Sequence, residues 1–279
     1  MIEIRKVNIK EVNQKPQQAV ENNIDTVSLI TDISEAFEQI KIRYENAFGD
    51  IKIENGKFDY PFDTIFSNEE MVHTNYPLVE STEDFISRLN ETTPIKSIEK
   101  FNALIKAMVE CAGYGTREGV VAAAMMLAYI YPKMTGYTLN YSHWYESTDE
   151  YREGITEDIK MDCRSFAWWC IYNGGYEWCI DDDGHILSHS FEFLEYAQNH
   201  PEKGLIKEGY ISGEPGDIAL KCDDDSHVFV IVGEYDGGYY TAEEGGESCG
   251  LIIRKRPYSE LEERGYTIID IEKFERRDY

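Results

Sequence analysis

Apolar residues are concentrated in the middle of the 279-residue chain. From Pro94 to Pro132 they recur at spacings of three and four on either side of a break at Gly113 to Gly115, which predicts two strongly apolar helices. Thr116 is a suitable N-cap for the second helix. Pro132 is expected to end that helix, because proline lacks the backbone N–H that a helix interior uses.

The first 93 residues have a weaker pattern. It predicts an amphipathic helix that ends at Gly49, a hairpin around Asn55-Gly56 and a short helix capped by Ser81. The change in composition near residue 94 divides the chain into two parts. Residues 1–93 are expected to form a mainly helical N-terminal extension of unknown role, and residues 94–279 the functional domain.

A third apolar helix is expected immediately after Asp162, whose carboxylate can accept hydrogen bonds from the free N–H groups of the first turn. Cys163 occupies that turn, where those N–H groups and the helix dipole favour a thiolate. Apolar residues follow on nearly every face until the stop at Gly174-Gly175. The pattern therefore predicts a buried helix with a thiol at its polar end.

After this helix the pattern changes to short runs of β-branched and aromatic residues between turn signals. The predicted strands cover residues 218–220, 227–232, 239–243, 251–254 and 266–271. Helices followed by a meander of strands indicate the α+β class, with helices packed on an antiparallel sheet of about five strands.

The charge of the chain excludes some partners. Fifty-three acidic residues against 27 basic ones give a net charge of −26, which argues against binding to nucleic acid or to an anionic membrane. No apolar run is long enough to span a bilayer, and the polar first 18 residues lack the apolar core of a signal peptide. We therefore expect a cytoplasmic chain as made, which reaches a cell wall only if another route releases it.

The six cysteines include no C-x-x-C pair, so no metal site and no cofactor are expected. The run Asp181-Asp182-Asp183-Gly184 lacks the ligand spacing of an EF-hand and is typical of a solvated turn. Cys163 and His227, a cysteine at a helix start and a histidine at a strand start, instead fit a nucleophile and its base. The alternative from residue types alone is a core thiol and a histidine bonded within a turn.

Three blocks of sequence resemble the NlpC/P60 group of papain-like cysteine peptidases. M-D-C-R-S-F-A-W-W-C-I-Y-N-G-G-Y is similar to its nucleophile helix, E-P-G-D-I-A-L-K followed by H-V-F-V-I-V-G to its histidine strand, and Y-Y-T-A-E-E-G to the strand of the orienting residue. The resemblance covers residues 95 to 271 and implies a nucleophile at Cys163, a base at His227 and an orienting residue at Glu243, with Glu244 as the alternative. Its upstream tyrosine falls at Tyr141 or at Tyr137.

The resemblance implies a cysteine peptidase or amidase, expected as a monomer, that hydrolyses amide bonds in peptidoglycan stem peptides or other peptides. Arg164 stands where the family has serine, so it either stabilises the thiolate or crowds the substrate. Alternatives are an intracellular amidase, deamidase or transferase on the same scaffold, and a non-catalytic binding module that kept the fold.

Overall fold

The computed structural model describes residues 33–54, 57–67, 69–72, 76–79, 81–139, 154–155, 161–177, 181–187, 189–223, 225–246 and 249–278. Tyr141 lies outside these residues. Within the described part, no helix combines the length and the apolarity that crossing a bilayer requires.

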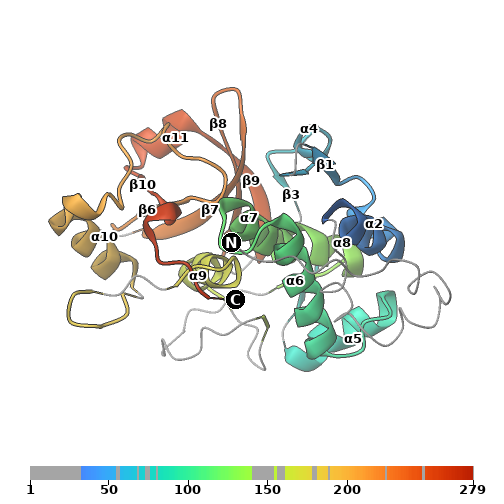
Figure 1. The fold of residues 1–279 in the computed structure, drawn as a ribbon. Coiled ribbons are helices and arrows are strands. Elements are labelled where there is room, and N and C mark those ends of the chain that lie inside the picture. Colours follow the sequence, from blue (N-terminus) through green and yellow to red (C-terminus); the bar gives the residue numbers. More distant parts are fainter. Residues whose placement is uncertain are drawn as a thin grey trace.

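A six-stranded antiparallel sheet forms one layer of the molecule (Figure 1). Its strands, in spatial order, are β10 (Thr267–Ile269), β6 (Ile218–Lys221), β7 (His227–Tyr235), β8 (Gly238–Glu244), β9 (Leu251–Pro257) and β3 (Met71–Val72). Five of them are the strands that the sequence predicts. The sixth, β3, comes from the N-terminal part of the chain and pairs with β9 at the edge of the sheet.

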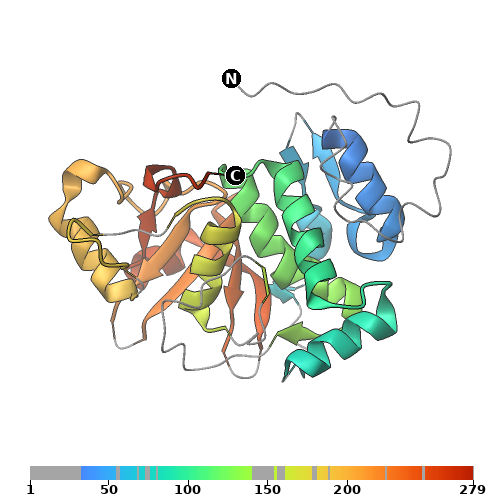
Figure 2. The same ribbon diagram turned by 60° about the horizontal axis from the view of Figure 1, so that its bottom comes forward.

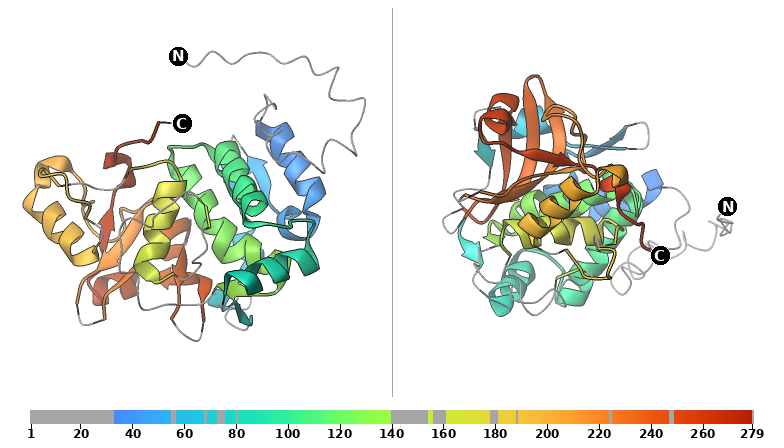
Figure 3. Two further views of the ribbon diagram at one scale, coloured as in Figure 1. Left: turned by 90° about the horizontal axis from the view of Figure 1, so that it is seen from below. Right: turned by 90° about the vertical axis from the view of Figure 1, so that its left-hand side faces the viewer.

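Helices cover one face of this sheet (Figures 2 and 3). The layer contains α6 (Ile98–Ala112), α7 (Arg117–Met125) and α9 (Cys163–Asn173), with α7 between the other two. Their apolar residues share one core with the strand residues that face them, among them Val228, Val230, Ala242 and Leu251. The opposite face of the sheet carries a smaller cluster around Phe229, Tyr239 and Tyr266, beside α11 (Tyr258–Glu263). A further helix, α10 (Ser190–Asn199), follows α9 in the chain. The α+β class is therefore confirmed.

The expected helix end at Pro132 is wrong. A π-helical turn, Met126–Ile130, follows α7 and leads directly into α8 (Tyr131–Thr135), which contains the proline. The wider turn changes the hydrogen-bond pattern just before Pro132, where a regular α-helix would bring the ring against a carbonyl. The helical segment ends instead at Gly136, which has a left-handed φ of 76° that glycine adopts more readily than other residues.

The N-terminal part contains both helices and short strands. Its elements are α2 (Ile33–Arg43), α3 (Glu45–Phe48), β1 (Lys52–Glu54), β2 (Lys57–Asp59), α4 (Phe62–Ile65), β3, β4 (Leu78–Val79) and α5 (Thr82–Thr92). Strand β4 pairs in parallel with β5 (Thr138–Leu139). The ring of Phe85 in α5 packs on Phe101 and Tyr131 at centroid distances of 5.2 and 4.8 Å. The division at residue 94 stays a prediction, but the two parts share apolar contacts.

Candidate active site

The start of α9 is fixed by a reciprocal cap. The backbone N–H of Ser165 donates to Asp162 Oδ1 at 2.6 Å, and the backbone N–H of Asp162 donates to Ser165 Oγ at 2.7 Å. This confirms Asp162 as the N-cap, while Ser165 supplies the second half of a capping box that the sequence analysis missed. Cys163 is therefore the first residue of a helix whose N-terminus is fixed by both hydrogen bonds of a capping box.

His227 begins β7 and is hydrogen-bonded to Glu243 of β8. The distance between His227 Nε2 and Glu243 Oε2 is 2.6 Å, and the imidazole is 18% exposed. Because an ionised carboxylate can only accept, Nε2 carries the hydrogen and Nδ1 presents its lone pair. Nδ1 makes no hydrogen bond with any residue in the described ranges. The ring is thus oriented from one side, and its basic nitrogen is available on the other.

A β-bulge decides which glutamate reaches His227. Glu243 and Glu244 are both candidates from the sequence for orienting His227, and the resemblance implies Glu243. The hairpin turn is Asp236-Gly237, since Tyr235 pairs with Gly238, and this two-residue turn alone would put Glu244 on the histidine face. Val232 is an extra residue in β7, because Ile231 pairs with Thr241 while Gly233 pairs with Tyr240. The bulge reverses the parity and brings Glu243 to His227.

Glu243 is buried and ionised. Only 1% of its surface is exposed, yet Arg256 Nε donates to Oε1 at 3.0 Å and Arg256 Nη2 to Oε2 at 2.5 Å. The hydroxyl of Thr241 adds a bond to Oε1 at 2.9 Å. Burial opposes the charge, but Arg256 and His227 outweigh it and hold the pKa of Glu243 well below its usual value. Glu243 therefore accepts hydrogen bonds in its charged form.

Arg256 was not foreseen, although it stands in a basic run of the C-terminal region, R-K-R at residues 254–256. Its guanidinium lies 4.7 Å from the centroid of the Phe229 ring and donates to Glu260 Oε1 at 2.5 Å. An arginine that is 2% exposed within a strand signals a buried carboxylate partner. The predicted strand 251–254 stops two residues before Arg256, and the structure extends it as β9 to Pro257.

The surroundings of Cys163 favour the neutral thiol. Burial, with the negative charges of Asp162 and Glu244, raises the pKa of Cys163 to about 12, although hydrogen bonding by the backbone N–H groups of Val228 and Arg164 lowers it. Burial therefore opposes the thiolate that the helix start favours. The helix start does contribute favourable N–H groups, but desolvation and the charge of Asp162, joined by that of Glu244 when it ionises, exceed them.

Cys163 and His227 approach the sheet from different sides. Cys163 packs with the main core, on the face of Val228 and Val230, whereas His227 shares the other face with Phe229, 6.1 Å away between ring centroids. Both are next to Val228, which follows His227 and whose N–H lowers the pKa of the thiol. Within the described residues no hydrogen bond joins the two side chains.

The other predicted site residues are partly placed. Arg164 Nη2 lies 3.7 Å from Asp162 Oδ2, and Nη1 lies 2.5 Å from His189 Nδ1, so its charge is held at the helix start. Tyr137 lies against Arg88 of α5, whose guanidinium is 4.3 Å from the ring centroid. No contact in the described part of the chain joins Tyr137 to Cys163.

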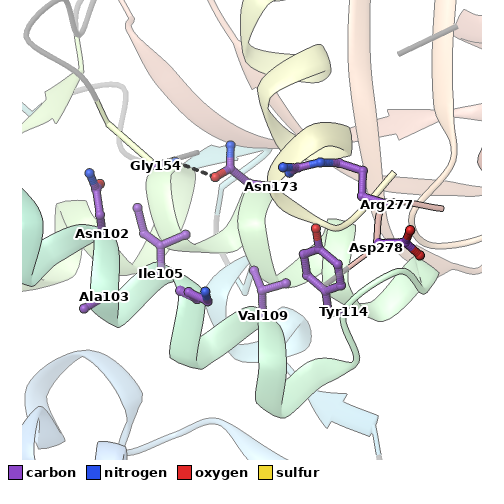
Figure 4. A pocket seen from close by; sticks show the side chains of 10 residues that line it. Asn102, Ala103, Ile105, Val109, Tyr114, Gly154, Asn173, Arg277 and Asp278 are labelled. Atoms are coloured by element: carbon purple, nitrogen blue, oxygen red, sulfur yellow. Dashed lines mark hydrogen bonds between the residues drawn. The ribbon is translucent and has the colours of Figure 1, made fainter. Parts of the chain in front are cut away.

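Two further features lie outside this site. Oxygen and nitrogen atoms of Asp181, Asp183 and His185 come within 4.8 Å of one another, but Asp181 Oδ1 accepts the N–H groups of the other two, as in a solvated turn. A cavity of about 220 Å³ opens at the far end of α9 beside Asn173, which accepts from Gly154 (Figure 4). The length of α9 separates this cavity from Cys163 by about 15 Å.

Comparison with protein-family models, with curated proteins and with solved structures finds no match for this chain. Functional inference therefore depends on the geometry of the residues themselves.

Proposed function

We propose that the chain is a cysteine hydrolase with a papain-like, NlpC/P60-type core, and that it cleaves amide bonds, in peptidoglycan stem peptides or other peptides. The observation that carries the proposal is the His227–Glu243 pair at 2.6 Å, anchored by buried Arg256 next to the capped cysteine helix. A base oriented by a carboxylate and a thiol at a helix start, on elements that contact each other, are the components that nucleophilic catalysis requires.

The reaction begins with transfer of the thiol proton from Cys163 Sγ to His227 Nδ1. The sulfur electron pair then forms a bond to the substrate carbonyl carbon, and the backbone N–H of Cys163 is a natural donor to the developing oxyanion. The imidazolium returns its proton to the leaving amine as the C–N bond breaks. Water, activated by the same nitrogen, then hydrolyses the thioester and restores the thiol.

This sequence requires Sγ and Nδ1 to come within hydrogen-bond reach when substrate binds. Catalytic hydrogen bonds are commonly long in free enzymes and shorten in the substrate complex. The pKa of about 12 for Cys163 means that His227 has to remove the proton during attack, because a preformed thiolate is scarce near neutral pH. The strongly acidic composition suits a substrate with free amines, such as a diamino acid in a stem peptide.

The test combines hydrolysis with thiol labelling. Purified peptidoglycan fragments are incubated with the protein and analysed by mass spectrometry for a cleaved stem-peptide bond. Cys163→Ala should abolish cleavage, and Cys222→Ala, which removes a half-buried thiol that the reaction does not use, should not. If Cys163 reacts with iodoacetamide faster than the buried Cys111 and Cys170 but no fragment is cleaved, the chemistry stands and the substrate class is wrong.

The second candidate is a binding module that kept the fold without the chemistry. The raised pKa of Cys163 and the absence of a direct bond from it to His227 among the described residues favour this reading. It predicts that iodoacetamide labels Cys163 no faster than Cys111 and Cys170, and that no fragment is cleaved near neutral pH. Those two results together would exclude the hydrolase.

A further inference from the structure

Glu244 is a second buried carboxyl in β8, on the opposite face from Glu243. It pairs with Leu251 of β9, whose side chain belongs to the main core under the helices. Only 2% of its surface is exposed, and Oε1 accepts the backbone N–H of Gly246 at 2.9 Å. No cation forms an ion pair with Glu244 within the described residues. Among the described residues, Glu244 is therefore a buried acid without a cationic partner of the kind that Glu243 has in Arg256.

Glu244 also lies on the thiol side of the sheet. Val230 pairs with Ala242, and continuing this register by two residues brings Glu244 level with Val228. The backbone N–H of Val228 lowers the pKa of the Cys163 thiol and the charge of Glu244 raises it, so both groups act on the same sulfur. Strand β8 also contacts α9 directly. The acid and the nucleophile thus share one environment.

The charged groups around Glu244 are mostly negative. Asp162 and Cys163 face it from the start of α9, and Glu243 is its neighbour in β8. Arg164 of α9 points to Asp162 and His189, and His227 of β7 is bonded to Glu243 on the other face, so neither side chain pairs with Glu244. Cys249 stands in the turn before β9. Burial, with Asp162 and Glu243, raises the pKa of Glu244 to about 8.

We propose that Glu244 is a positioning residue for the chemistry of Cys163: protonated, it leaves the thiol free to lose its proton, and ionised, it places a second carboxylate beside the sulfur and holds it as the thiol. The use of this control in hydrolysis rests on the function proposed above. Two carboxyl groups in one strand with opposite protonation at neutral pH are a recurring arrangement in acid–base sites.

Alkylation by iodoacetamide tests the coupling without any hydrolysis. The sulfur displaces iodide and forms a C–S bond, so the rate follows the fraction of thiolate. The rate at Cys163 is measured by peptide mass spectrometry between pH 6 and pH 9.5 for the wild-type chain, Glu244→Gln and Glu234→Gln. Glutamine keeps an oxygen for the Gly246 N–H, and Glu234 is an exposed glutamate at the far end of β7, so its variant is the matched control.

At pH 6 the wild-type and Glu244→Gln chains should react at rates within about twofold, because Glu244 is neutral in the first and absent in the second. At pH 9 the Glu244→Gln chain should react on the order of tenfold faster, corresponding to one pKa unit at the thiol. The wild-type profile should flatten near pH 8 and then rise again, and that of Glu234→Gln should match it.

A ratio of Glu244→Gln to wild-type rates that stays constant from pH 6 to pH 9.5 would overturn the proposal. If Glu244→Gln does not fold, the wild-type profile decides by itself, since a straight rise through pH 8 excludes the coupling. Failure here leaves the hydrolase proposal standing, and a failure of peptidoglycan cleavage leaves this coupling standing, because the two readouts are independent.

Discussion

Arg256 donates two hydrogen bonds to Glu243, the residue that orients His227. Nε donates to Oε1 at 3.0 Å and Nη2 to Oε2 at 2.5 Å. The same Oε2 accepts from His227 at 2.6 Å. The buried carboxylate of Glu243 therefore accepts hydrogen bonds from both a permanent cation, Arg256, and a titratable ring, His227. Since Arg256 already balances its charge, the contribution of Glu243 to His227 is mainly orientation and tautomer choice.

We expect Glu243→Gln to reduce hydrolysis by at least about 100-fold, because a neutral amide fixes neither the tautomer nor the orientation of the base as the carboxylate does. Glu244→Gln, the matched change one residue away, should stay within a few-fold of wild type at pH 6. The comparison uses kcat/KM on the same peptidoglycan fragment. A larger loss at position 244 would show that Glu243 does not orient His227.

Arg256→Met should lower the free energy of unfolding by about 3–5 kcal/mol, because it leaves the carboxylate of Glu243 buried without its cation. Arg254→Met is the control two residues away, where the side chain is 31% exposed and lies 3.4 Å from Glu260, and it should cost less than about 1 kcal/mol. Urea unfolding at pH 7 measures both. Equal costs would mean that the Arg256–Glu243 pair has no special role in stability.

Glu243 and Glu244 should give the stability opposite pH dependences. The pKa of Glu243 is depressed in the folded chain, so its contribution is present above the ordinary value of 4.5 and is lost as the pH falls below it. The pKa of Glu244 is raised to about 8, so its contribution is present below 4.5 and is lost as the pH rises through 8. The free energy of unfolding of Glu244→Gln, relative to that of wild type at the same pH, should therefore be higher at pH 8 than at pH 5.

For Glu243→Gln, the destabilisation should instead be larger at pH 7 than at pH 4. Urea midpoints for each variant and wild type at pH 4, 5, 7 and 8 check both signs. If the stability difference from wild type changed with pH in the same direction for both variants, the opposite environments of these neighbouring carboxyls would be contradicted.

Arg164→Ser should keep turnover within about tenfold of wild type, or about 1.4 kcal/mol in activation free energy. Its guanidinium is engaged by Asp162 and His189, and the backbone N–H of residue 164, which acts on the thiol, remains in the variant. Kinetics on the cleaved fragment, with thiol alkylation in parallel, measure the effect. Complete loss of cleavage with unchanged alkylation would assign the arginine to substrate binding.

Removing residues 1–93 should destabilise the remaining chain. The deletion takes Phe85 away from Phe101 and Tyr131, and it removes β3 from the edge of β9. Urea unfolding of residues 94–279 beside the full chain is the measurement. A fragment as stable as the whole would support the division at residue 94 that the composition indicates.

Local features of the site can be predicted from the sequence, because they depend on neighbouring residues. Asp162 caps α9 since its side chain reaches the N–H of Ser165 three positions on, and the alternation of Val228, Val230 and Val232 marks a buried strand whatever surrounds it. The position of Cys163 at the helix start and of His227 at the strand start follows from those two patterns.

Only the tertiary structure decided the rest, because the deciding interactions join distant segments. The bulge at Val232 selects Glu243 over Glu244, and no local pattern marks it. The pKa of Cys163 is raised mainly because burial, which only folding produces, outweighs the helix N–H groups that the sequence makes visible. The charge of the adjacent Asp162 adds to this effect, as does that of Glu244, 81 positions along the chain. Strand β3 joins the sheet, and Arg256 meets Glu243, for the same reason: backbone pairing and desolvation act between residues that only folding brings together.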